Sequence, residues 1–298
     1  MKLKRKISAY FNDLYNLHCK YVESFINEIL RKLSPKDACY LKNIIQKIGG
    51  RKTYFSFDEV NNMYCCSEGC QQHYFSNRDR GFYLFSKGLK NRINDLGESY
   101  FIDRIKFDGD SVIIDCGANS GELYAYLRKI ISPGNYHFFE PSPTDFQSVL
   151  LNTGKVFGNM EALYSSEEDL KLHLAVSRGD SSILEPQKGF DEIIPIKATT
   201  LDKYVSLHSI KSIRLFKVEA EGLEPEVLVG AQKSLPMIDY ICLDGGEERG
   251  LAANETLSTC SNILFANGFV IDFLSLRTSR VLFRNSSRVH DSNNRHDS

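Results

Sequence analysis

Two apolar segments of the chain each end beside residues that can hold a nucleoside. Val112–Asp115 leads directly into a turn that contains Gly117 and Gly121, and Tyr136–Glu140 ends in a carboxylate. In a doubly wound α/β sheet, such glycines let the backbone approach a ligand, and the acid at the tip of the next strand accepts hydrogen bonds from ribose hydroxyls. We therefore expect a cofactor-dependent enzyme in which Glu140 binds a ribose.

The turn favours a cofactor without phosphates. Asn119 stands where a dinucleotide-binding turn has its second glycine, and a pyrophosphate needs a backbone with no side chain in its way. Asp115 and Glu122 add negative charge, which would repel a diphosphate and would suit a cationic sulfonium or its amino group. These residues favour S-adenosylmethionine over a nicotinamide cofactor. A tight strand–helix turn that binds no ligand is the alternative.

A second group of acids follows the apolar segment Arg214–Glu219. Glu219 and Glu221 lie on one side of the chain if this segment is extended, and Pro225 suits the first position of a helix. At the carboxyl edge of a sheet, two carboxylates could act as a general base, orient a substrate hydroxyl or hold a divalent cation. In the alternative, Glu224, with or without Glu221, only stabilises the helix N-terminus.

Two further motifs carry weaker signals. Asp244 ends the next predicted strand and is a reserve candidate for substrate contact, with a solvated loop as the alternative. Cys65, Cys66, Cys70 and His73 are close enough together to suggest zinc, but their spacing matches no common finger and lacks a second cysteine pair. We expect packed or surface thiols there, and no metal site.

Hydrophobic periodicity predicts alternating strands and helices in the C-terminal two-thirds of the chain, as βαβ units require. The predicted strands are Val112–Asp115, Tyr136–Glu140, Leu170–Val176, Arg214–Glu219, Tyr240–Leu243, Phe269–Leu274 and Arg280–Arg284. The predicted helices are Glu122–Ile131, Pro143–Asn152, Pro225–Leu235 and Ala253–Asn267. No helical pattern separates the last two strands, so they should form an antiparallel hairpin. Glu161–Asp169 is too polar to assign.

The first hundred residues predict an appendage to this domain. Apolar residues recur at helical steps over Ala9–Leu33, and a second helix is expected over Asp37–Ile48. Residues 51–100 lack a long periodic run, so we expect an irregular cap over the sheet, with a short strand at Arg78–Phe85. The predicted divisions are 1–50, 51–100, 101–285 and a disordered tail, 286–298. We expect these helices to pack on the domain that follows; the alternatives are a partner-binding or membrane-surface helix, or a contact that joins two copies of the chain.

Composition excludes several classes of partner. The chain has 298 residues, 42% of them hydrophobic, and a formal net charge of −1, so no general attraction to nucleic acid is expected. No segment has the roughly 20 consecutive apolar residues that span a bilayer, and the basic start of the chain is followed by no apolar signal-peptide core. The eight scattered cysteines are expected to stay reduced. We expect a cytoplasmic protein.

Four motifs taken in order resemble the FkbM family of S-adenosylmethionine-dependent methyltransferases. They are Ile113–Gly121, Phe139–Pro141, Thr200–Asp202 and Phe216–Glu224. The resemblance implies the class I methyltransferase fold, a Rossmann-like sheet of seven strands that is mostly parallel and ends in an antiparallel hairpin. It also implies that the methionine end of the cofactor lies against four residues of the first motif, Asp115, Gly117, Asn119 and Gly121, with Glu140 on the ribose. Residues 165–177 would border the adenine.

The resemblance further implies methyl transfer to a hydroxyl oxygen of a sugar, glycan or natural product. Glu219 and Glu221 match the acidic motif of the family, which usually has aspartate at the position of Glu219. We expect one of these two carboxylates to serve as the base, with a divalent cation as an open variant. The rival functions are a nicotinamide-dependent oxidoreductase and a methyltransferase-like module that binds without catalysing.

Overall fold

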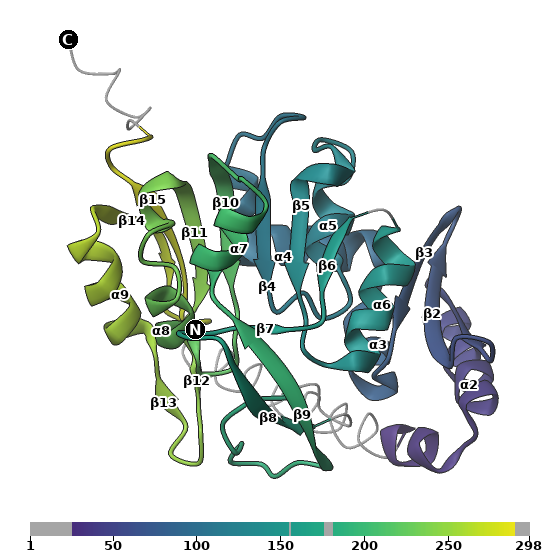
Figure 1. Ribbon diagram of the computed structural model, residues 1–298. Helices are drawn as coiled ribbons and strands as arrows, with labels where there is room; N and C mark the ends of the chain where they lie inside the picture. The colour runs from purple at the N-terminus through teal and green to yellow at the C-terminus, as the bar shows by residue number, and fades with distance from the viewer. Residues whose placement is uncertain (1–25, 155, 176–180, 290–298) are drawn as a thin grey trace, which may run out of the picture.

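A twisted sheet of seven strands forms the centre of the protein (Figure 1). The computed structural model describes residues 26–154, 156–175 and 181–289. The strands lie in the order β14 (Phe269–Ser275), β15 (Arg280–Asn285), β11 (Ile238–Asp244), β10 (Ile213–Val218), β4 (Ile113–Cys116), β5 (Tyr136–Phe139) and β6 (Phe157–Asn159). All neighbours pair in parallel except β15, which is antiparallel to both β11 and β14. The expected class I methyltransferase fold and its terminal hairpin are confirmed.

Both faces of this sheet are buried under helices. Side chains alternate along each strand, so that Ile113 and Leu215 face one hydrophobic cluster while Ile114 and Phe216 face the other. The first cluster lies under α4 (Leu89–Ser99), α5 (Glu122–Leu127) and α6 (Pro143–Thr153). The second lies under α7 (Leu201–Leu207), α8 (Glu224–Val229) and α9 (Leu257–Ala266). This three-layered packing fixes the strand ends from which the polar side chains project.

The seventh strand of the sheet is not the one that the sequence predicted. β6 takes that place, whereas the predicted strand Leu170–Val176 is found as β8 (Glu168–Leu174) in a separate sheet. That sheet has the order β7 (Ala162–Leu163), β9 (Glu192–Thr199) and β8. β6 has only three residues, none of them buried, so it carries no hydrophobic pattern to reveal it. A short hairpin of β12 (Glu247–Arg249) and β13 (Asn254–Glu255) completes the strands.

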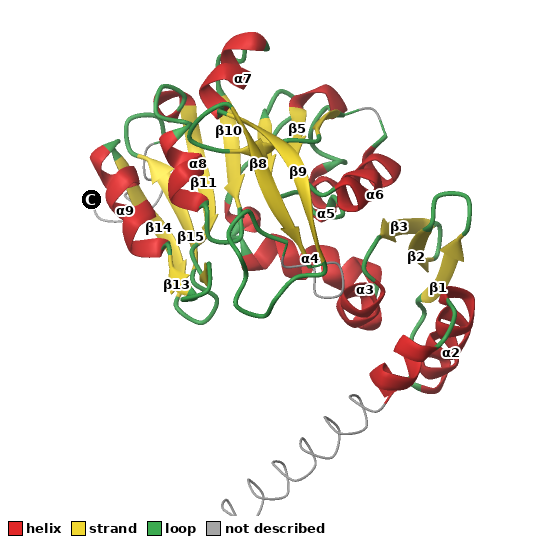
Figure 2. Cartoon of the chain, turned by 60° about the horizontal axis from the view of Figure 1, so that its bottom comes forward, coloured by secondary structure: helices red, strands yellow, loops and turns green. Residues whose placement is uncertain are grey.

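The described residues before the central sheet, 26–112, form an ordered N-terminal unit. Its first part lies beyond the β6 end of the sheet, whereas α4 packs against the sheet itself (Figures 1 and 2). Helix α2 (Pro35–Ile48) packs on an antiparallel sheet of β1 (Tyr54–Asp58), β2 (Met63–Glu68) and β3 (Gln71–Phe75). This sheet replaces the irregular cap that we expected. The predicted strand at Arg78–Phe85 is wrong, because α3 (Arg78–Leu84) occupies it and the Asn77 side chain accepts a hydrogen bond from Arg80 N, which caps the helix.

Two contacts fasten the N-terminal unit to the glycine turn. The side chain of Asn152 in α6 bonds to both backbone groups of Tyr74 in β3 and donates to the Ser120 carbonyl at 2.8 Å. The ring Nε2 of His73 lies 3.0 Å from the Ser120 hydroxyl, and burial lowers the pKa of His73 to about 4, so the ring is neutral. The conformation of the turn therefore depends on residues from both parts of the chain.

The expected N-terminal helices are described only in part. The predicted helix Asp37–Ile48 is confirmed as α2. Residues 26–32 are helical, and the rest of the predicted helix Ala9–Leu33 lies outside the described residues, as do positions 290–298 of the predicted tail. Within the described chain, no helix combines the length and apolar character that crossing a bilayer demands.

Candidate cofactor-binding and active site

A cavity opens at the carboxyl edge of the parallel strands, where ligands of doubly wound sheets bind. The space within it, including its mouth, which is open to solvent, is about 1060 Å³. Six of the seven residues proposed from the sequence line it, and Gly121 is the exception. Asp115 lies in β4 itself, Gly117 and Asn119 follow β4, Glu140 follows β5, and Glu219 and Glu221 follow β10.

The turn after β4 has glycine at position 117 because the segment after β10 passes close to it. A Cβ atom on Gly117 would lie 2.1 Å from the carbonyl oxygen of Glu219, and Gly117 has a left-handed φ of 76°. The backbone N–H groups of Gly117 and Ala118 donate to the carbonyl of Phe139 at 3.0 and 3.2 Å. The turn is thus clamped between the ends of β5 and β10.

Gly121 has a packing role instead of a place in the cavity. It precedes α5 with a φ of 79°, and a Cβ atom there would lie 3.2 Å from Val149 and 3.3 Å from Thr153 in α6. The glycine lets α5 and α6 approach each other. Its predicted contact with the cofactor has no counterpart among the residues that line the cavity.

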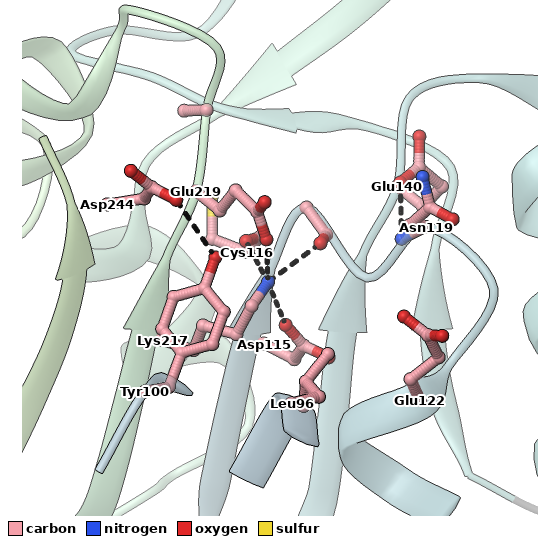
Figure 3. A network of polar contacts seen from close by, with 12 residues as sticks. Leu96, Tyr100, Asp115, Cys116, Asn119, Glu122, Glu140, Lys217, Glu219 and Asp244 are labelled. Atoms are coloured by element: carbon pink, nitrogen blue, oxygen red, sulfur yellow. Dashed lines mark hydrogen bonds and ion pairs between the residues drawn. The ribbon is translucent and has the colours of Figure 1, made fainter. Parts of the chain in front are cut away.

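Glu140 is a buried carboxylate that the backbone holds in place. Its Oε2 accepts a hydrogen bond from Asn119 N at 2.8 Å, and its Oε1 accepts one from Ser142 N at 3.0 Å (Figure 3). Burial raises the pKa of Glu140 to about 8, and the nearby Asp145 carboxylate adds to this effect. Such a group gains from new hydrogen-bond donors, which ribose hydroxyls would supply.

Lys217 is a site residue that sequence reasoning missed. Its side chain is only 3% exposed, and its Nζ lies 3.1 Å from Asp115 Oδ1, 2.9 Å from Glu219 Oε2 and 2.9 Å from the Gly117 carbonyl (Figure 3). Burial alone would lower the pKa of Lys217, but the two carboxylates keep it above its usual range, so the ammonium stays charged. The signal was a lysine inside the apolar segment Arg214–Glu219, because buried lysines are almost always paired.

Glu219 is held as an anion by the cations around it. Burial alone would raise its pKa, but Lys217 and Arg280 outweigh this effect and lower the pKa of Glu219 to about 2. A carboxylate with so low a pKa is a weak base at neutral pH. The geometry therefore suits a fixed negative charge at the cavity wall better than the proton acceptor that we expected.

Tyr100 interacts with both Glu219 and Asp244, the weaker of the predicted candidates for substrate contact. Its buried hydroxyl donates to Asp244 Oδ2 at 3.3 Å, and Glu219 interacts with the same phenol (Figure 3). Arg280 stacks 4.1 Å from the Tyr100 ring and donates from Nε to Asp244 Oδ2 at 2.8 Å. Burial raises the pKa of Tyr100 well above its usual range, so it remains a neutral donor. Asp244 is thus a buried partner of Tyr100 and Arg280 at the end of β11 and no solvated loop residue, but it does not itself line the cavity.

Glu221 and Glu224 have different roles in the turn after β10. Glu221 lines the cavity with a left-handed φ of 49°, and its carbonyl accepts a hydrogen bond from Ser182 Oγ at 2.8 Å. Glu224 is buried, and its carboxylate accepts hydrogen bonds from Ala220 N, at 2.8 Å, and from the Thr256 hydroxyl. Glu224 therefore fixes the turn that presents Glu221, in agreement with the structural alternative.

The chemistry of the cavity fits S-adenosylmethionine. Gly117 presents a backbone without a side chain to the cavity, and the buried carboxylate of Glu140 can bind ribose hydroxyls. Acidic side chains outnumber basic ones among the described residues that line the cavity, which suits a sulfonium cation. No group of three or more histidine, cysteine, aspartate or glutamate side chains in the described chain could hold a metal ion.

Comparison with known proteins identifies the domain. Residues 115–257 match the family model of the methyltransferase FkbM domain. None of the curated proteins matches the sequence at a significant level.

Several solved structures are similar to the chain at low identity. A protein of the NADB-Rossmann superfamily from Streptococcus agalactiae is 13% identical, with a TM-score of 0.36 over 60% of this chain and 63% of that one. Fibrillarin from Aeropyrum pernix, with natively bound S-adenosyl-L-methionine, is 13% identical, with a TM-score of 0.35 over 59% and 66%. A putative rRNA methylase from Clostridium thermocellum is 13% identical, with a TM-score of 0.38 over 63% and 94%. The chain spans less than two thirds of the length of the first two.

Proposed function

We propose that this protein, whose residues 115–257 form a methyltransferase FkbM domain, transfers a methyl group from S-adenosylmethionine to a hydroxyl oxygen of a sugar, glycan or natural product. The observation that carries the proposal is the buried Glu140 carboxylate beside a bare glycine turn. The acceptor class follows from the resemblance to the FkbM family. The protein acts as an enzyme, and its N-terminal unit completes the cavity.

The same turn disfavours the nicotinamide alternative. The backbone N–H of Asn119 already donates to Glu140, so it is not free to bind a phosphate. A diphosphate would also meet the carboxylates of Asp115, Glu219 and Glu221 in the cavity. S-adenosylmethionine carries no phosphate and brings a positive charge, which these acids attract.

The residues of the site would act chiefly by positioning. S-adenosylmethionine, when bound, supplies an electrophilic methyl group on a good leaving group, so alignment of the acceptor oxygen provides most of the acceleration. Glu219 offers a fixed negative charge near the end of β10. Glu221 follows it on the cavity wall and is the second acid that could take the proton.

The cations of the site favour an uncharged acceptor group. Arg92 is paired with Glu122, Arg280 with Asp244, and Lys217 with two carboxylates. These acidic partners, together with the excess of acidic over basic side chains in the described cavity lining, disfavour a strongly anionic acceptor such as a phosphate ester. A hydroxyl needs only a hydrogen-bond acceptor and a defined orientation, and both are available from the acids after β10.

Calorimetric titration tests the donor. We expect the full chain to bind S-adenosylhomocysteine and not to bind NAD, and we expect Glu140→Ala to weaken the binding. Binding of NAD with no response to S-adenosylhomocysteine would make the protein an oxidoreductase. Release of S-adenosylhomocysteine during incubation with cell-extract metabolites and glycans then tests catalysis, and no release from any fraction would favour a binding module.

A further inference from the structure

Residues outside the matched domain bring positive charge to the cavity. Arg80 in α3, Arg92 in α4 and Arg280 in β15 all line it, and all lie outside residues 115–257. Arg92, Glu122, Glu219 and Arg280 all line this cavity, and Arg92 interacts electrostatically with the other three. Arg280 stacks on Tyr100, which Figure 3 shows on the far side of Lys217 from Glu140.

The opposite region of the cavity is suited to a base. Asn159, the last residue of β6, lies beside the end of β5 and accepts a hydrogen bond from Glu140 N at 3.1 Å. The chain then runs into β7, and Ala162 and Leu163 line the cavity together with Leu172. A nucleoside whose ribose lies at Glu140 can bury its base against these apolar side chains. Its 5′ substituent then points along the glycine turn toward the arginines.

Arg92 is fixed by two hydrogen bonds to Glu122, and one of its nitrogen atoms donates no hydrogen bond within the described residues. Its Nε and Nη2 atoms donate to the two carboxylate oxygens of Glu122 at 2.7 and 2.6 Å, and its side chain is 19% exposed. Arg280 uses its Nε for Asp244 and its Nη1 for Ser99. Within the described part of the chain, Nη1 of Arg92 and Nη2 of Arg280 donate no hydrogen bond, so each guanidinium can donate to one more oxygen atom.

We propose that Arg92, fixed by Glu122 and assisted by Arg280, binds the carboxylate of the amino-acid end of the donor. The inference rests on the proposed function. The carboxylate is the only anion of S-adenosylmethionine, and a guanidinium with free N–H groups is the partner that matches its geometry. Helix α4, which precedes the matched domain, is then part of the donor site.

A comparison of ligands tests the proposal without any substitution. S-adenosylhomocysteine, its decarboxylated analogue, which keeps the amine, and 5′-methylthioadenosine are titrated calorimetrically into the full chain. We expect loss of the carboxylate to weaken binding roughly 10- to 100-fold, as for other hydrogen bonds to charged groups. Equal affinity for S-adenosylhomocysteine and its decarboxylated analogue would overturn the inference and leave the proposed function intact. No binding of any of the three would remove the proposed function itself.

Paired variants assign the effect to Arg92. In Arg92→Gln/Glu122→Gln both charges are removed together, so no buried charge is left alone, and we expect the preference for the carboxylate to shrink to a few-fold while 5′-methylthioadenosine binds as before. Arg249 and Glu226 form a similar two-bond pair outside the cavity lining, so Arg249→Gln/Glu226→Gln is the matched control and should keep the full preference. An unchanged preference in the first variant would exclude Arg92.

Discussion

At the residue scale, Lys217 is the cation on which two buried carboxylates depend. Asp115 is 1% exposed and Glu219 22% exposed, so neither can rely on water to solvate its charge. We expect Lys217→Met to lower the free energy of unfolding by about 3–5 kcal/mol, because both acids lose their ion pair, although Tyr136 still donates to Asp115 and Arg280 still interacts with Glu219. Urea denaturation measures the change.

The surface pair of Lys203 and Glu167 supplies the control for this experiment. Both side chains are about half exposed, and Lys203→Met should cost less than about 1 kcal/mol. A cost for Lys217→Met no larger than that of Lys203→Met would show that the buried cluster is not held by its charges.

Glu140 should make nucleoside binding depend on pH. Its ionised form accepts hydrogen bonds from hydroxyl groups more strongly than its protonated form, and its pKa of about 8 leaves about a tenth of it ionised at pH 7. Adenosine itself has no group that titrates between pH 7 and 9. Its affinity should therefore rise over this range as Glu140 ionises, by up to about tenfold. Calorimetry at a series of pH values measures this, and Glu140→Gln should give weaker binding with no such rise. A flat profile in the wild-type chain would contradict the role of Glu140.

At the element scale, the prediction succeeded wherever a strand is buried on both faces. The predicted strands that correspond to β4, β5, β10 and β11 differ from the structure by no more than two residues at either end, since continuous apolar runs identify them. The glycine turn and the acids after β5 and β10 could be located for the same reason, because the topology brings strand ends to one edge.

Elements that owe their place to tertiary contacts could not be predicted. β6 is exposed and exists because β5 offers it a partner, and α3 begins at a cap on Asn77 within a segment that has an apolar run typical of a strand. Arg92 gave no signal at all, since its approach to Glu122 depends on how α4 packs against α5.

The chain segments that follow β4 and β10 approach each other so closely that we expect no room for a side chain at position 117. Gly117→Ala adds a Cβ atom 2.1 Å from the Glu219 carbonyl and strains a left-handed backbone. Gly50→Ala has the same type of strain at φ +65°, with nothing within 4 Å of the new atom. We expect Gly50→Ala to cost roughly 1–2 kcal/mol and Gly117→Ala roughly 1–3 kcal/mol more. Equal costs in urea denaturation would show that the backbone there can move apart.

At the scale of the whole molecule, the N-terminal unit and the methyltransferase domain share their packing. A Cβ atom on Gly97 of α4 would lie 2.4 Å from the Tyr126 ring, and that ring packs against clusters on both sides. Asn152 joins β3 to the glycine turn, and Arg92 joins α4 to α5. A structural division at residue 100 would have to break all of these contacts, so we expect the two parts to unfold together.

Donor binding should therefore protect the N-terminal unit as much as the central sheet. A ligand at 100 times its Kd stabilises the folded state by about 2.7 kcal/mol, and a cooperative molecule transmits this gain to every amide that exchanges by global unfolding. Amide hydrogen exchange with and without S-adenosylhomocysteine should show equal added protection for Cys66 in β2 and Phe216 in β10, both fully buried. The amide of the exposed residue Val60 donates only within its own turn, to Asp58, so it should exchange by local opening; it provides the control and should not change. Added protection confined to β10 would mean that the N-terminal unit opens separately, and it would also weaken the case for Arg92 as part of the donor site.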